Sequence, residues 1–190
     1  MREVWVSTDV TSEPVSSAEA KLFAKIPSTA DDTVVAYEIK SAREEVEHYT
    51  GCSLAEKTLI AEWDSLPEDN TIELPYGPVK SITSVVMVDE DGTTETLTTA
   101  DDEYYELGTI WKKLQINTIP LSTQRLKVTY VAGYGATGCP ALPSALKECI
   151  LKAVATNYEY RENFTEGMAK QNEWQKKAAQ YRRSEEHTSE

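Results

Sequence analysis

The sequence predicts an α+β protein: a small helical bundle with an inserted antiparallel β-sheet or partial barrel and an extra C-terminal helix. Two changes of pattern carry this prediction. Apolar residues recur with a helical period near both ends of the 190-residue chain, but with a period of two from Leu54 to Val131. A glycine-rich loop, Gly133–Gly138, then connects the last strand to a helix.

Two helices are expected before the sheet. Ser16 is a plausible N-cap, with Glu19 three residues later as its capping-box partner, and this first helix ends before Pro27. A second helix runs from about Asp32 to Tyr49, with Gly51 at its C′ position. Its buried stripe is Val35, Ile39, Ala42, Val46 and Tyr49, and the charged residues expected away from that stripe are Lys40, Arg43, Glu44 and Glu47.

The central region reads as short strands with turns between them. An Asp91-Gly92 pair predicts the tip of a hairpin. Such strands are typical of a small antiparallel sheet or partly closed barrel. We place them at Lys57–Trp63, Thr71–Leu74, Ile82–Val88, Thr93–Thr98, Tyr104–Leu107, Lys113–Ile116 and Arg125–Val131.

The glycine loop reads G-x-G-x-x-G between a strand and a helix, which is the order found in dinucleotide-binding proteins. We reject that function, because Pro140 and Pro143 separate the last glycine from the helix and no βαβ repeat lies beside it. A connecting loop that needs positive φ angles explains the glycines. The helix that follows carries Leu146, Ile150, Val154 and Tyr158 on one face.

A last helix is expected from about Met168 to Arg183, followed by a flexible tail, residues 184–190. Its apolar stripe is weak and its other faces are basic, which predicts a helix that is not fully packed on its own domain. Aromatic side chains and Arg are enriched at protein interfaces. The aromatic residues in or beside the C-terminal helical region are Tyr134, Tyr158, Tyr160, Trp174 and Tyr181, with core packing the competing explanation for Tyr158.

Composition excludes several classes of function. The net charge of −13 argues against general nucleic-acid binding. No apolar run is long enough to span a bilayer, and the N-terminus lacks a signal peptide's apolar segment. Three cysteines without paired spacing predict reduced thiols, and with His48 and His187 the only histidines in the sequence we expect no metal site. We also expect no cofactor. The charge is uneven: residues 144–183 hold eight Lys and Arg against five Asp and Glu, whereas residues 1–143 hold 11 against 24.

No motif of a known catalytic centre is present, so we expect no enzymatic activity. His48 is expected at the surface or as a helix cap. Paired carboxylates can bind a cation or transfer protons, but at predicted turns they are more often only solvated. These pairs are Asp31-Asp32, Asp89 and Asp91, and Asp101-Asp102.

Several phrases, in this order and spacing, resemble the phage head–tail connector (adaptor) family, in the subgroup with a β-sheet insertion between the helices. The resemblance covers roughly residues 15–163. The phrases are VEHYTG at the end of the second helix, IELPYGPVKSITSV and VDEDGT in the strand region, and VTYVAGYG and NYEYREN around the glycine loop and the following helix.

The resemblance implies a structural virion protein that forms a ring, dodecameric to match the portal, at the head–tail interface. Such a ring extends the DNA channel, lets genomic DNA pass without sequence-specific binding, and offers a surface to the stopper or tail. Assembly would take place in the host cytoplasm, with no membrane contact. The implied domains are an N-terminal arm, 1–14; a helical core, 15–54 plus 140–163; an inserted β domain, 55–131; and a C-terminal helix and tail, 164–190.

Two other classes stay open. A ligand- or peptide-binding module would be a stable monomer, and a small metal-dependent enzyme would have converging carboxylates in a deep pocket. The candidate contacts with the portal or a neighbouring subunit are Trp174, Lys176, Lys177, Tyr181, Arg182, Arg183 and Trp5.

Overall fold

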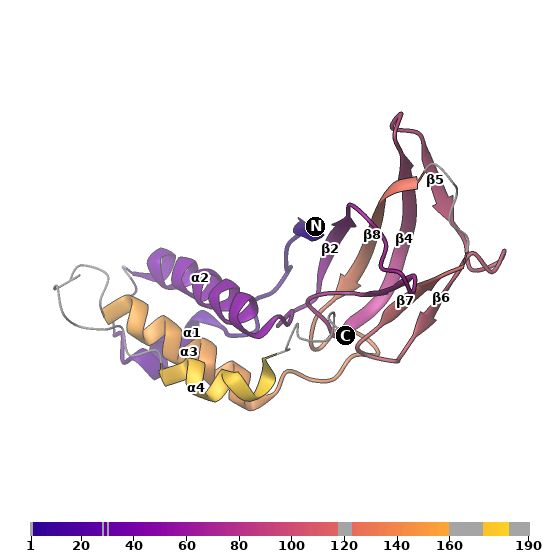
Figure 1. The fold of residues 1–190 in the computed structure, drawn as a ribbon. Helices are drawn as coiled ribbons and strands as arrows, with labels where there is room; N and C mark the ends of the chain where they lie inside the picture. The colour runs from indigo at the N-terminus through magenta and orange to yellow at the C-terminus, as the bar shows by residue number, and fades with distance from the viewer. Residues whose placement is uncertain (1, 28, 30, 118–122, 160–172, 183–190) are drawn as a thin grey trace. The chain divides into compact units, whose positions relative to one another are not determined.

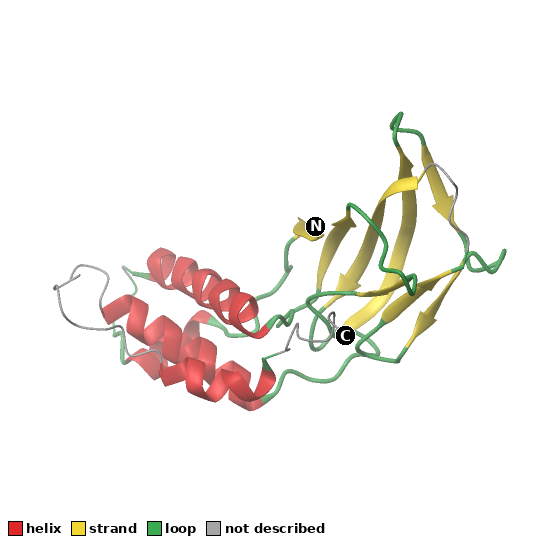
Figure 2. Ribbon diagram, viewed as in Figure 1, coloured by secondary structure: helices red, strands yellow, loops and turns green. Residues whose placement is uncertain are grey.

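The computed structural model describes residues 2–27, 29, 31–117, 123–159 and 173–182. The chain divides into two compact units, each made of two separate stretches of sequence. One comprises Met1–Thr11 and Ala55–Ala141, and the other Ser12–Leu54 and Leu142–Glu190. All described strands lie in the first unit and all described helices in the second (Figures 1 and 2).

The β unit contains two antiparallel sheets. The five-stranded sheet has the order β1-β2-β8-β4-β5, with β1 Arg2–Thr8, β2 Lys57–Trp63, β8 Thr123–Ala132, β4 Val79–Asp89 and β5 Thr94–Leu97. The three-stranded sheet has the order β3-β7-β6, with β3 Thr71–Glu73, β7 Lys113–Ile116 and β6 Tyr104–Leu107. The described strands form no closed barrel, so the predicted α+β class is confirmed with open sheets.

Alternation decides which side of each strand is buried. On β2, Leu59, Ala61 and Trp63 point into the core, whereas the residues between them are partly exposed. The phenol of Tyr130 on β8 is fully buried and donates a hydrogen bond to the Pro75 carbonyl oxygen at 2.7 Å. The core of the β unit therefore lies under one face of the central strands.

The helical unit is built from α1 Ser17–Ala24, α2 Asp32–Thr50, α3 Ser144–Glu159 and α4 Glu173–Ala178, followed by the short 3-10 helix η1, Ala179–Tyr181. The predicted capping box of α1 is confirmed: Glu19 N–H donates to Ser16 Oγ at 3.3 Å, and Ser16 N–H donates to Glu19 Oε2 at 2.9 Å. Gly51 caps α2 with a φ of 68°, also as predicted. None of the described helices is long and apolar enough to cross a membrane.

The predicted hairpin and glycine loop are confirmed. Gly92, at the tip of the β4–β5 hairpin, has a φ of 85° and donates to the Asp89 carbonyl at 3.0 Å. Gly133 has a φ of 144°, and a Cβ there would lie 2.1 Å from the Ala55 carbonyl oxygen. The glycine therefore serves close backbone packing, and its N–H is bonded to Pro78 at 2.8 Å.

Two expectations about exposure are wrong. Arg43 and Glu47, expected away from the buried stripe of α2, are only 1% and 3% exposed. Trp174 and Ala178, expected on a helix not fully packed, are 3% and 0% exposed. Arg43 pairs with Glu13, and Trp174 packs on Tyr49, both far away in the sequence. Periodicity within one helix does not reveal such partners. Residues 1–14, expected as an arm, contain edge strand β1, which pairs with β2 along its length.

Candidate assembly surfaces

The C-terminal segment is held on the helical unit by one buried aromatic side chain. The indole of Trp174 meets the ring of Tyr49 on α2 edge to face, with ring centroids 5.5 Å apart. The Trp174 carbonyl accepts a hydrogen bond from Cys149 Sγ on α3 at 3.5 Å. Trp174 is thus a core residue that anchors α4, and it has little surface to offer a partner.

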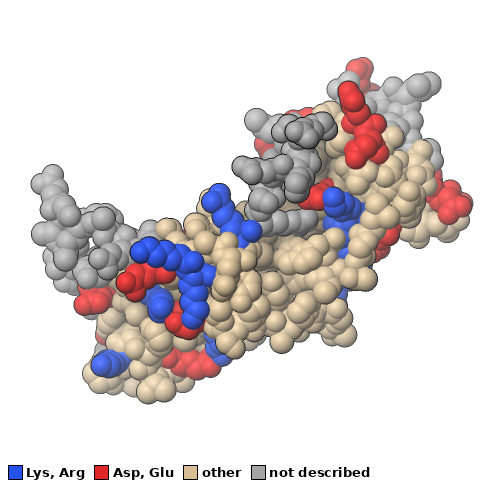
Figure 3. Space-filling view, turned by 60° about the horizontal axis from the view of Figure 1, so that its bottom comes forward, with Lys and Arg blue, Asp and Glu red and all other residues tan. Residues whose placement is uncertain are grey.

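The basic residues of α4 divide into one paired and one exposed lysine. Lys177 forms an ion pair with Glu148 on α3, and Lys152 lies 3.2 Å from the same carboxylate. The hydrogen bond from Lys177, followed by that from Lys152, lowers the pKa of Glu148. Lys176 is exposed. On the helical unit, at the left of Figure 3, acidic and basic side chains lie next to one another.

The end of the described segment packs on the C-terminal end of α2. Cys52 Sγ lies 3.7 Å from the Tyr181 carbonyl oxygen, and the Arg182 guanidinium carbon lies 5.6 Å from the centroid of the Tyr49 ring. Tyr181 is half-buried and Arg182 is exposed. Trp174, Lys177, Tyr181 and Arg182 are therefore brought together around α2 and α3, with Arg182 and Lys176 facing solvent.

The other candidates lie elsewhere or outside the description. Trp5 is in β1 of the β unit, 39% exposed, with Lys127 Nζ 5.9 Å from its ring centroid. Arg183 and Tyr160 lie outside the described residues. Tyr158 is half-buried and donates to Asp31 Oδ2 at 2.7 Å.

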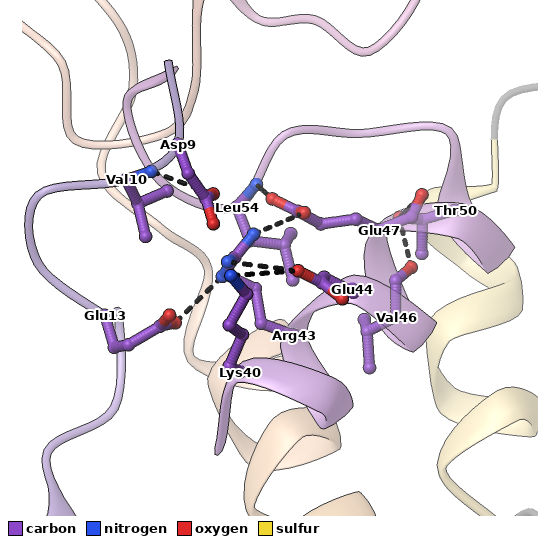
Figure 4. Close-up of polar contacts among 10 residues, drawn as sticks. All are labelled: Asp9, Val10, Glu13, Lys40, Arg43, Glu44, Val46, Glu47, Thr50 and Leu54. Carbon is purple, nitrogen blue, oxygen red and sulfur yellow. Dashed lines mark hydrogen bonds and ion pairs between the residues drawn. The ribbon is translucent and has the colours of Figure 1, made fainter. Parts of the chain in front are cut away.

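A buried ion-pair network was not predicted from the sequence (Figure 4). Arg43 donates from Nη1 to Glu47 Oε2 at 2.9 Å and from Nε to Glu13 Oε2 at 2.8 Å. Glu47 Oε1 in turn accepts from the backbone N–H of Leu54 at 2.8 Å. The sequence did contain one sign of this ion pair. Arg43 and Glu47 have opposite charges, are four residues apart, and each follows a residue of the buried stripe.

Exposed apolar side chains were also missed. On the helical unit, Leu22 and Phe23 of α1 are 83% and 43% exposed, and Val34 and Tyr37 of α2 are 36% and 70% exposed. The β6–β7 hairpin exposes three more, Tyr105, Leu107 and Trp111. Large exposed apolar side chains that gather in one region mark interaction sites.

The carboxylates at turns are, from the sequence, possible cation ligands. Among the described residues, no group of three or more potential ligands could hold a metal ion. The pKa of Asp91 is lowered because its carboxylate accepts hydrogen bonds from Thr93, first of all from the backbone N–H. This is the role of a turn-forming aspartate. His48 is exposed near the end of α2.

Comparison with known proteins identifies the family. A family model described as head completion protein matches residues 14–173. The chain therefore belongs to the head completion protein family, which confirms the resemblance found in the sequence motifs. No curated protein matches the chain.

Three solved structures share the fold. A chain in the neck of an empty gene transfer agent (GTA) particle, computed with C6 symmetry, is 18% identical with a TM-score of 0.75, and the match covers 95% of both chains. A chain in the virion of the native GTA particle is 19% identical with a TM-score of 0.72 and 94% coverage of both chains. A chain in the neck of the native GTA particle, computed with C12 symmetry, is 18% identical with a TM-score of 0.65, covering 92% of this chain and 94% of that one.

Proposed function

We propose that this chain is a structural subunit of the neck of a tailed, phage-like particle, where copies of it form a ring between head and tail. Membership of the head completion protein family is the observation that carries this proposal. The same fold occurs in GTA necks computed with C6 and C12 symmetry, and a ring of twelve copies is compatible with both. The chain acts by binding other proteins and catalyses no reaction.

The two units take different parts in this ring. Residues 15–54 and 140–163 form the ring body, and residues 55–131 contact neighbouring subunits or the next protein of the neck. The C-terminal helix and tail, 164–190, reach the portal. The acidic body of the chain, with its net charge of −13, repels phosphate and so lets DNA slide through the channel without being gripped.

The portal contact is made by the solvent-facing side of the C-terminal segment. Lys176 and Arg182 are exposed there, and Tyr181 is half-buried beside them. Arg183 adds a further positive charge in the sequence. The buried Trp174 and the ion pair of Lys177 with Glu148 hold this segment in place on the helical unit. Trp5, on the β unit, is a separate contact for a neighbouring subunit.

The first test is assembly with the portal protein from the same genome. Light scattering and negative-stain imaging should reveal rings, either of the protein alone or only when the portal is added. A protein that remains monomeric and does not bind the portal would overturn the proposal and favour a ligand- or peptide-binding module.

A charge reversal then tests the portal surface. The double variant K176E/R182E should lose portal binding while its far-UV circular dichroism stays that of the wild type. The matched control K25E/K40E reverses two exposed lysines on the same unit and should bind the portal normally. Equal binding by both variants would rule out the C-terminal segment as the portal contact.

A further inference from the structure

Strand β6 is an open edge with an unusual side-chain composition. It pairs with β7 on one side, and no other described strand pairs with its second side. The backbone groups on the open side of an edge strand can pair with another chain, and natural proteins usually protect such edges with charge. Here the edge carries Tyr105 and Leu107, which are 46% and 38% exposed, on either side of the exposed Glu106.

Both side chains lie on the outer face of the three-stranded sheet. Tyr105 is opposite Gln115, and Leu107 is opposite Lys113. Directly opposed residues of antiparallel strands share a face. The other face carries Leu114 and Ile116, which are 0% and 1% exposed and belong to the core.

The outer face changes from polar to apolar as it approaches the open edge. On the β3 side, Glu73 forms an ion pair with Lys113, and Thr71 Oγ1 lies 2.7 Å from Gln115 Oε1. These paired polar groups end at β7, and of the three strands of this sheet only β6 exposes large apolar side chains. A third such residue, Trp111, is 40% exposed in the turn of the same hairpin.

The charge around this edge is acidic. Residues 101–112 hold four acidic side chains and one lysine, a net charge of −3, and the lysine, Lys112, is paired with Glu106. Asp101 and Asp102 are exposed immediately before β6, and the Asn117 N–H bonds to the Glu103 carbonyl at 2.8 Å, which fixes this acidic turn at the start of the strand.

We propose that the open edge of β6 binds an extended, Lys- or Arg-bearing segment of another protein, which adds as a fourth strand to the sheet β3-β7-β6. The backbone of β6 supplies the hydrogen bonds, and alternate apolar side chains of the incoming segment pack on Tyr105 and Leu107. The acidic turn attracts its positive charges and repels both DNA and acidic segments. The assignment of this segment to the next protein of the neck rests on the proposed function. The binding mode is argued from β6 alone and does not depend on that function.

A peptide of eight residues alternating Lys and Val tests the binding mode on the full-length protein. Fluorescence anisotropy of the labelled peptide should detect binding at concentrations up to about 1 mM. Hydrogen exchange should then show new protection of the amides of Tyr104 and Glu106, whose N–H groups face the open side, whereas Tyr105 and Leu107 already pair with β7. The same peptide with Glu in place of Lys, or with its backbone amides methylated, should bind about tenfold more weakly or not at all.

Two matched double variants test whether the peptide binds at the edge of β6. Y105K/L107K makes the edge of β6 positive and should weaken binding of the Lys-Val peptide about tenfold or more. W5K/V6K makes the same change at exposed positions of the edge strand β1 and should leave binding unchanged. No binding of the Lys-Val peptide, equal binding of the Glu-Val peptide, or an equal effect of the two double variants would overturn the proposal.

The proposed ring is tested separately by adding the portal. Y105K/L107K should still assemble with the portal as the wild type does, because the portal contact is proposed for the C-terminal segment and the edge of β6 is proposed to bind the next protein of the neck. If the wild type forms no rings with the portal, the proposed function is wrong, but the peptide-binding result is unaffected. Normal rings without peptide binding would overturn only the proposal for β6.

Discussion

Arg43 Nη1 donates to Glu47 Oε2 at 2.9 Å, and both side chains are almost completely removed from solvent. Arg43 also binds Glu13, and Glu47 binds the N–H of Leu54. The pair therefore fixes the two places where the chain enters and leaves the first stretch of the helical unit, Ser12–Leu54. Removing one partner leaves a buried charge without compensation.

Arg43→Ala should lower the free energy of unfolding of the helical unit by about 3–5 kcal/mol, because Glu47 loses its buried partner. Urea unfolding followed by circular dichroism at a helical wavelength measures this change. Lys40→Ala is the matched control, since the Lys40–Glu44 pair is exposed at 3.9 Å and contributes less than about 0.5 kcal/mol. The double variant R43M/E47L should recover much of the lost stability; equal losses for R43A and K40A would contradict the assigned role.

Glu19 links the start of α1 to α3, and its environment predicts a dependence of stability on acid. The hydrogen bond from Lys147, followed by those from Ser16, lowers the pKa of Glu19 from 4.5 to about 2. The folded pKa is below the unfolded value, so the stabilisation is complete above pH 4.5 and is lost as the pH falls toward 2. Glu19→Gln should remove the part of the decline in urea midpoint that Glu19 causes over this pH range. Lys147→Gln should make the decline smaller than in the wild type, because the pKa of Glu19 is then lowered less. A decline in E19Q as steep as in the wild type would exclude this cause.

Gly133→Ala should destabilise the β unit by about 3 kcal/mol or more, because the new Cβ would lie 2.1 Å from the Ala55 carbonyl oxygen. Gly135→Ala, in the same loop, tests the backbone conformation alone: its φ is 76° and a Cβ would meet no atom within 4 Å. That variant should cost only about 1–2 kcal/mol. Urea unfolding monitored by tryptophan fluorescence compares the two, and equal losses would argue against close packing at Gly133.

Trp174→Ala should lower the stability of the helical unit by about 3–5 kcal/mol, because it empties a site that is packed against Tyr49. Lys176→Ala, two residues along, should change stability by less than about 0.5 kcal/mol, since its side chain is exposed. Thermal unfolding measures both. A small loss for W174A would return Trp174 to the list of candidate interface residues.

The three cysteine thiols should react at different rates in the native protein. Cys139 is partly exposed, whereas Cys52 and Cys149 are buried. Burial also raises the pKa of Cys139 and of Cys149, which keeps less of each as reactive thiolate. A disulfide reagent should therefore modify Cys139 first, and more slowly than a free thiol. Rapid modification of all three thiols without denaturant would contradict the packing of α2 and α3.

Local sequence signals placed most elements of the fold. The strands Lys57–Trp63, Tyr104–Leu107 and Lys113–Ile116 have the predicted bounds, and α2 ends one residue later than expected. These elements are determined by alternation, by capping residues and by glycines at positive φ, all of which act within a few residues.

The errors occurred where a distant segment changes the environment of a residue. Arg43 and Glu47 have the charge of surface residues, and only Glu13 and Leu54, held by the fold, explain their burial. The stripe of α4 is too short to predict packing, yet Trp174 meets Tyr49, which is far away in the sequence. For the same reason Trp174 was placed at the candidate interface, whereas the exposed Lys176 and Arg182 remain proposals.

The order of strands constrains how the protein is made on the ribosome. β8 lies between β2 and β4 and pairs with both, so these two early strands are joined in one sheet only after residues 123–132 emerge. The helical unit likewise waits for α3, which follows β8 in the chain. A nascent chain interrupted before this point therefore has neither unit complete.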